Sequence, residues 1–284
     1  MGTPNTAFVR QYQDTISLLV QQLDSRLRGC VMVDTNFTGD SKFYEQYASD
    51  SMVELTSRYS DTPIQLPDHR RRKVTPRYYV SNTLEDPKDA LQMLIDPKST
   101  YMQAKQAAAA RQIDDTIITA FNATAYTGQE GTTTQAFDSN NQIAVGTTGL
   151  TKAKMLSAKK LLDAAEVDKE DRFIVTSAEQ VEDLLNTTEV TSGDYNVVRT
   201  LVQGEINTWI GFQFKHSERL NTSGGNRLVY AWQRKAMQLA IQKDVMGRVD
   251  PRPDKNYAWQ VYMKLCLGAT RLEEARIVEI ACAE

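Results

Sequence analysis

Histidine and cysteine are scarce in this chain, and the residues that usually build metal or catalytic sites do not cluster. Its 284 residues include two His and three Cys. Neither His69 nor His216 has Cys, His or acidic neighbours at the spacing of metal ligands. The sequence contains no GxSxG, HExxH, GxxxxGK or post-strand GxGxxG motif. We therefore expect no catalytic site, cofactor site or metal site, and we predict that the protein is not an enzyme.

Long apolar runs and a strong charge of one sign are also missing. No apolar run approaches the roughly 18–20 residues of a transmembrane helix, and the polar N-terminal segment does not fit a secretion signal. The net charge of −3 and the pI near 5.6 favour neither a strong nucleic-acid binder nor a membrane-attracted protein. Three distant cysteines without a CxxC pair predict a cytosolic protein with reduced, buried thiols.

One long stretch of helix-forming residues, 96–125, dominates the chain. Asp96 is a suitable N-cap, and Pro97 fits the first helical position, where no backbone N–H is needed. Alanines 107–110 add intrinsic helix propensity. A helix over residues 97–125 would be about 43 Å long, enough to cross a domain.

An apolar stripe runs along this predicted helix and should pack on the strands at the end of the chain. It consists of Ile113, Ile117, Ile118 and Phe121, at helical spacing. The charged positions are expected to face solvent or a neighbouring subunit: Lys98, Lys105, Arg111 and Asp114.

A long hairpin is predicted before the helix. Between residues 50 and 82, two β-prone runs flank a polar tip that contains proline. Pro63, Pro67 and Pro76 argue against central strands of a packed sheet. Because the hairpin has too few apolar residues for a core of its own, we expect it to project and to lie on another surface.

The basic run HRRRK, residues 69–73, is the strongest charge feature of the sequence, and we interpret it as a loop. Such a cluster can bind phosphate by releasing counterions, although no reading helix or zinc site accompanies it. The alternative is a charged loop that faces solvent or bridges two subunits. The candidate residues for a contact between subunits are Arg70, Arg71, Arg72, Lys73 and Arg77.

The remaining segments alternate between helix and strand patterns. A second helix is predicted over 150–166, followed by a buried strand at 173–175 and a helix that starts with a capping box of Ser177 and Gln180. The β-prone pieces that follow complete an α/β lobe over about 168–243; they are 196–202, 208–215 and 228–232.

The end of the chain is mostly strand. A strand at 245–249 precedes a turn at 250–253, and a long alternating strand covers 259–267. Gly268-Ala269 is expected to interrupt it before a last strand at 277–282. At the other terminus, apolar residues between Phe8 and Leu27 fall near helical periodicity. They suit either a helix on its own core or an arm on a neighbouring subunit.

The order of these features resembles a tailed-phage major capsid protein of the HK97-like fold. Five stretches carry the resemblance: DPKSTYMQAKQAAAARQIDDTIITAF, GLTKAKMLSAKKLL, DRFIVTSAEQVEDLL, GEINTWIGFQFKHSERL and KLCLGATRLEEARIVEI. The resemblance implies an α+β fold with four parts. These are an N-terminal arm (1–50), an E-loop hairpin (51–90), a P domain with a long spine helix and long β-strands (91–167 and 244–284), and an α/β A domain (168–243).

The resemblance also implies a structural function, that of a virion subunit assembled in the host cytoplasm. Members of this family form icosahedral shells of hexamers and pentamers, usually on a scaffolding protein, and package double-stranded DNA through a portal. Decoration proteins are further partners in this class. Mild acidity suits a shell that contacts its DNA only weakly and nonspecifically. Some members join neighbours through Lys–Asn isopeptide bonds, and we assign no residues of this chain to such a bond.

Two other functions compete with this interpretation. An encapsulin-like nanocompartment would share the fold but copurify with a cargo enzyme instead of phage DNA. A nucleic-acid-binding module that uses Arg70–Lys73 would lose its salt-dependent binding when those residues are neutralised.

Overall fold

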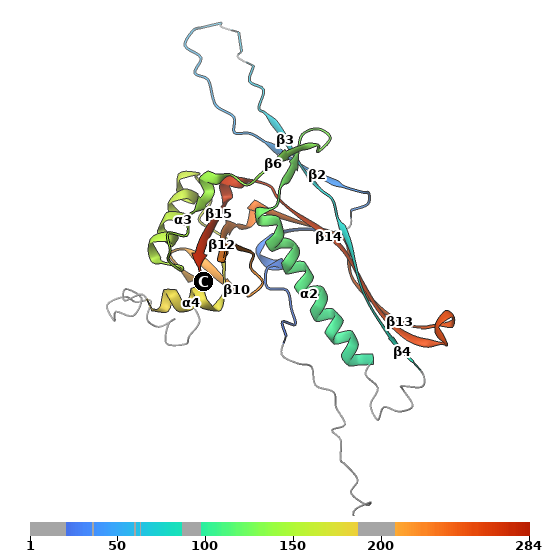
Figure 1. The fold of residues 1–284 in the computed structure, drawn as a ribbon. Helices are drawn as coiled ribbons and strands as arrows, with labels where there is room; N and C mark the ends of the chain where they lie inside the picture. Colours follow the sequence, from blue (N-terminus) through green and yellow to red (C-terminus); the bar gives the residue numbers. More distant parts are fainter. Residues whose placement is uncertain (1–20, 36, 60, 63, 87–97, 187–207) are drawn as a thin grey trace, which may run out of the picture. The chain divides into compact units, whose positions relative to one another are not determined.

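The computed structural model describes residues 21–35, 37–59, 61–62, 64–86, 98–186 and 208–284, and every structural statement below concerns these residues (Figure 1). The chain forms two compact units. Unit 1 contains 78–111 and 244–265 together with the start of the chain up to Asp24, and unit 2 contains 25–77, 112–243 and 266–284.

A seven-stranded mixed sheet forms the centre of unit 2. Its order is β7 (Gln142–Ile143), β15 (Ile277–Ala283), β12 (Asn226–Gln233), β8 (Arg172–Thr176), β10 (Phe212–His216) and β9 (Thr208–Trp209), with β11 (Thr222–Ser223) paired to β12. β12 is antiparallel to both neighbours, whereas β8 and β10 are parallel. The last strand of the chain therefore lies inside the sheet of the α/β lobe, beside β12.

Local sequence signals explain several elements of this lobe. All five residues of β8 are buried, as the run of apolar residues at 173–175 predicts. The Ser177 backbone N–H donates to Gln180 Oε1 at 2.9 Å in the predicted capping box, and α4 (Ala178–Leu185) starts there. The helix predicted over 150–166 is confirmed as α3 (Lys152–Ala164), with Thr151 as its N-cap.

The β-prone pieces predicted for the lobe have different outcomes. The β-prone piece 208–215 is divided into β9 and β10 by a turn at Ile210-Gly211, where both residues have positive φ. The strand predicted at 228–232 is confirmed as part of β12. The piece at 196–202 lies outside the described residues.

The long helix is confirmed as α2, from Lys98 to Asn122, and its apolar stripe is buried. Phe121 stacks on Tyr230 and tilts against Trp232, with ring centroids 4.8 Å apart in both pairs. Both partners belong to β12, so the stripe packs on the sheet that holds the terminal strand. Asp96 and Pro97 lie outside the described residues, so the predicted N-cap stays a prediction.

The C-terminal end of α2 comes three residues earlier than predicted. The chain leaves the helix after Asn122 because residues 125–127 form strand β5, which pairs with β3 through Lys73↔Tyr126. The expectation that charged helix positions face outward is wrong for two of them. Asp114 is buried in unit 2, and Lys105 is buried in unit 1, where its Nζ donates to Ser81 Oγ at 2.9 Å.

Asp114 is buried because it caps backbone N–H groups from a distant segment. Its carboxylate accepts from Ser25 Oγ (2.6 Å), Arg26 N (3.0 Å) and Leu27 N (3.2 Å), just before the 3-10 turn η1 (Arg28–Cys30). A buried charge needs such partners. Leu27 is buried as well, whereas the rest of the periodic segment from Phe8 lies mostly outside the described residues.

A second sheet of unit 2 contains the hairpin. Its order is β2 (Lys42–Tyr47), β3 (His69–Val74), β5 (Ala125–Thr127) and β6 (Thr133–Gln135). β2 and β3 are antiparallel, and Ala48 N–H donates to Asp68 O at 2.9 Å where they open into a loop over residues 48–68. The predicted hairpin exists, but its first strand is 42–47. The apolar run after residue 50 is exposed loop and not strand.

A third sheet has the order β1 (Met32–Thr35), β13 (Met237–Arg252), β14 (Ala258–Arg271) and β4 (Arg77–Glu85). In unit 2, β1 runs parallel to 238–241 of β13. In unit 1, the Tyr78 and Tyr262 hydroxyls lie 3.0 Å apart. The predicted turn at 250–253 lies further along the chain, since β13 continues to Arg252 and η4 (Pro253–Lys255) follows it.

The prediction that Gly268-Ala269 interrupts the long strand is wrong. β14 continues through Gly268 to Arg271, and a Cβ at this position would lie only 2.9 Å from Thr75 O and 3.2 Å from Pro76 Cα. Glycine is therefore required at this position because two backbone segments of unit 2 come close together. The prediction of a last strand at 277–282 is confirmed as β15.

The three cysteines are free and buried, as predicted. Burial raises the pKa of each thiol, that of Cys282 to about 12, so the unreactive thiol form dominates at neutral pH. Among the described helices, none is both long and apolar enough to cross a membrane.

Candidate assembly surface

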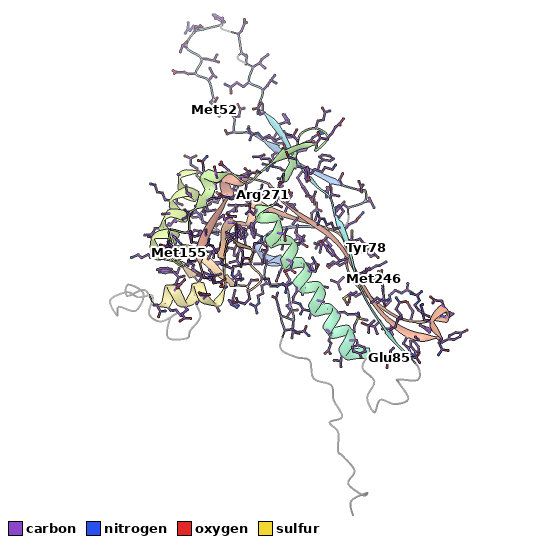
Figure 2. The ribbon with its side chains drawn as sticks, viewed as in Figure 1. Met52, Tyr78, Glu85, Met155, Met246 and Arg271 are labelled. Carbon is purple, nitrogen blue, oxygen red and sulfur yellow. The ribbon has the colours of Figure 1, made fainter. Side chains whose placement is uncertain are left out.

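The hairpin loop 48–68 exposes an unusual number of large apolar side chains. We call the following set the apolar tip: Met52, Val53, Leu55, Tyr59, Ile64 and Leu66. Ile64 and Leu66 are 85% and 89% exposed, and Met52 and Tyr59 are completely exposed. Figure 1 shows the loop leading away from β2 and β3, and Figure 2 labels Met52 on it. So much exposed apolar surface in one segment indicates an interaction site.

The basic run at the base of this loop is strand β3, so its interpretation as a loop is wrong. Side chains alternate between the two faces of the strand. Arg71 forms a cross-strand ion pair with Glu45 at 2.7 Å, and Arg72 is buried. The stem of Lys73 packs against Gly131, where a Cβ would come within 2.4 Å of Lys73 Cδ. Three of the five candidate residues thus contact their own chain.

Arg70 and Arg77 remain as the exposed candidates. Both side chains are solvent-exposed, and within the described part of the chain neither has a hydrogen-bond or ion-pair partner. These two are therefore the members of the basic set best placed to reach another molecule.

Arg72 joins the hairpin to a buried group of charges. Its Nε donates to Leu272 O at 3.1 Å, and its Nη2 lies 3.9 Å from Glu274 Oε1. Glu274 also faces Arg271 Nη2 at 3.3 Å and accepts from Gln135 Nε2 at 3.0 Å. Burial lowers the pKa of both arginines, with Glu274 acting in the opposite direction. A guanidinium stays protonated in proteins, so two cations share one buried carboxylate.

Arg271 stabilises the C-terminal end of α2. Its Nη1 donates to Phe121 O at 2.9 Å and also to Ala123 O, and its guanidinium lies 5.2 Å from the centre of the Phe137 ring. A cation at this end of a helix satisfies terminal carbonyls and complements the helix dipole. The sequence offers no local signal for this role, because the carbonyls and Arg271 lie far apart in the chain.

The hydrogen-bonding side chains described so far do not form a reaction centre. In the described segments, no group of three or more His, Cys, Asp or Glu side chains is placed to hold a metal ion. His216 Nε2 lies 3.3 Å from Glu218 Oε1 at the surface. Asp114 and Asp115 point to different partners, Ser25 and Arg219, and so do not act as a carboxylate pair.

Comparison with known proteins identifies a matching protein family and several solved structures with the same fold. A family model described as phage capsid protein matches residues 5–284. No curated protein matches the sequence. In a capsid of cyanophage Pam1, a chain with 14% identity has a TM-score of 0.76 and covers 99% of this chain and 98% of its own. A capsid chain of cyanophage P-SCSP1u has a TM-score of 0.75 at 15% identity, covering 98% and 94%.

A further structural match is the capsid of a native GTA particle, with a TM-score of 0.74 at 13% identity and coverage of 99% and 97%. At such identities the likeness shows the fold, and that fold is the α+β, HK97-like capsid fold with a long spine helix and long strands, as predicted.

The fold defines a class of structural proteins to which the solved capsid chains belong. The chain belongs to the phage capsid protein family. It is therefore a structural component of the virion, which confirms the predicted capsid function and virion location. The family match favours the capsid function over the encapsulin-like alternative and the nucleic-acid-binding module.

Proposed function

We propose that this capsid subunit assembles into hexamers and pentamers of an icosahedral head, and that the apolar tip of one copy lies on a neighbouring copy. The exposure of the tip is the observation that carries this proposal. Burying one large aliphatic side chain contributes about 1.5–3 kcal/mol, and several per subunit can offset the cost of association. A projecting loop without a core of its own gains stability only through such a contact.

The same proposal includes the other partners of a phage head. A scaffolding protein would direct assembly in the host cytoplasm, a portal would admit double-stranded DNA, and a decoration protein could bind the outside. The net charge of −3 supports weak, nonspecific contact between shell and DNA. The four-part division into arm, E-loop, P domain and A domain also belongs to this proposal, with β2 as one strand of the projecting hairpin.

The first test replaces three residues of the tip together: Leu55→Ser, Ile64→Ser and Leu66→Ser. We expect the variant to remain folded but to form no shells, because these side chains are exposed in the single chain. Light scattering and negative-stain electron microscopy measure assembly, and circular dichroism checks folding. A control with Thr56→Ser and Thr62→Ser changes exposed polar positions of the same loop and should assemble normally. Normal shells from the triple variant would contradict the proposal.

We further propose that Arg70 and Arg77 form ion pairs with acidic side chains of a neighbouring copy. Exposed pairs contribute about 0.2–1 kcal/mol each and are screened by salt. Replacing both residues by Gln should raise the subunit concentration needed for assembly severalfold and reduce its dependence on salt. Arg71→Gln, which removes a pair within the chain, is the matched control. An unchanged threshold and salt dependence would argue against this contact. DNA binding that fell with the double substitution alone would instead assign the two residues to nucleic acid.

A further inference from the structure

Three elements of unit 2 meet at the buried carboxylate of Glu274. The C-terminal end of α2 is joined to it through Arg271, which donates to Phe121 O and faces Glu274 Oε1. The hairpin is joined to it through Arg72 of β3, and the end of β14 through Arg271 itself. Figure 2 shows Arg271 beside the C-terminal end of α2.

The burial of this group makes its geometry costly to change. The side chains of Arg271, Arg72 and Glu274 are 0%, 7% and 10% exposed. A rotation of β3 away from this position would break the Arg72 Nε–Leu272 O hydrogen bond and withdraw one of the two cations from Glu274. Loss of this partly buried hydrogen bond and of the ion pair with Glu274 makes such a rotation unfavourable.

A second set of contacts holds the other strand of the hairpin. Tyr44 OH donates to Asp34 Oδ2 at 2.9 Å, and Lys42 forms an ion pair with the same carboxylate, which joins β2 to β1. A small apolar cluster of Phe37, Val74 and Ala240 lies beneath Tyr44. The hairpin is thus attached to unit 2 on both strands, whereas its loop is exposed.

We propose that Arg72 is a positioning residue that fixes the direction of the β2–β3 hairpin relative to the C-terminal end of α2. The charge group of Arg72, Arg271 and Glu274 holds β3 in one orientation, and the contacts of Asp34 retain β2 when Arg72 is removed. Loss of Arg72 then lets the hairpin adopt several directions without detaching it. The relevance of this direction to shell formation rests on the proposed contact of the apolar tip.

Spin labels at two exposed positions of unit 2 can measure this direction. Ala48→Cys places a label where the hairpin opens into the loop, and Ser157→Cys places one on α3. The distance distribution is recorded by pulsed electron resonance on the full chain, below the concentration at which light scattering detects assembly. The chain without introduced cysteines shows whether the buried native thiols react.

For Arg72→Met we expect the distance distribution to broaden about twofold, since more than one orientation becomes populated. Arg72→Lys keeps the charge beside Glu274 but cannot make both contacts, and should broaden it less. The control is Arg71→Met, on the same strand but half-exposed and paired with Glu45, which should leave the distribution unchanged.

An unchanged distribution in folded Arg72→Met would overturn the proposal, and so would equal broadening in Arg71→Met. If neither Arg72 variant shows a cooperative thermal transition, Arg72 is a residue of the core and the positioning role is wrong. These outcomes are independent of the triple substitution in the apolar tip, which tests assembly without altering the charge group.

Discussion

Replacing Arg271 with methionine is expected to lower the free energy of unfolding by about 3–5 kcal/mol, the usual cost of removing one partner of a buried ion pair. The substitution leaves Glu274 with only the more distant Arg72 as a cationic partner. It also leaves the carbonyls of Phe121 and Ala123 without the donor that binds them at the end of α2. Urea denaturation of the unassembled chain, followed by circular dichroism, gives the free-energy difference.

A matched control is available a few residues further along the chain. Arg276 also pairs with an acidic residue three positions away, Glu273, but this pair is partly exposed. Arg276→Met should therefore cost less than about 1 kcal/mol, as surface ion pairs do. Similar losses for both variants would show that burial of the Arg271–Glu274 pair does not determine its contribution.

Replacing Phe121 with alanine is expected to cost about 3–5 kcal/mol, because it leaves a cavity in a close-packed core. Phe121 is fully buried, and its ring contacts both Tyr230 and Trp232. The substitution removes contacts between α2 and β12 and so destabilises the subunit. We therefore also expect fewer intact shells at a given protein concentration. Urea denaturation followed by tryptophan fluorescence is a suitable measurement, since Trp232 lies at the affected contact.

Leu156→Ala is the control for this experiment. Leu156 lies on α3 and is 47% exposed, so its loss should change stability by less than about 0.5 kcal/mol. If Phe121→Ala were as mild as this control, the packing of α2 on the sheet would contribute little, and the role of α2 as the spine of the subunit would be contradicted.

Elements with a strong local pattern could be predicted from the sequence. The helix around 98–122 combines high helix propensity with a continuous apolar stripe. β8 has a run of buried apolar residues, and α4 after it begins with a capping box. The boundaries were less accurate. α2 ends at Asn122 because residues 125–127 form a strand that pairs with β3. The local sequence of this segment does not indicate that pairing.

The candidate assembly surface could likewise be predicted only in part. Sequence located the basic run and predicted a projecting hairpin, but it could not tell which arginines face inward. In β3 a change of one position moves a side chain to the opposite face. Arg72 is buried because Leu272 and Glu274 lie beneath it, and Arg70 is exposed because no acidic residue of the described chain reaches it. The apolar tip was missed as a surface because residues 52–59 were assigned to a β-prone run, whereas Ile64 and Leu66 were assigned to a polar tip.

The sequence by itself determined the long helix, the buried strand followed by a capped helix, and the long terminal strands; the capsid fold class came from the resemblance of their order to a known family. These features follow from backbone sterics and from apolar periodicity, which act between residues close in the chain. Only the tertiary structure decided that Asp114, Arg72 and Arg271 are buried, that the Glu274 side chain is only 10% exposed, and that the apolar tip is exposed. Apart from the Arg271–Glu274 pair, which lies three residues apart, the partners of those charges come from distant segments, and a charged side chain enters the interior only where such partners meet it.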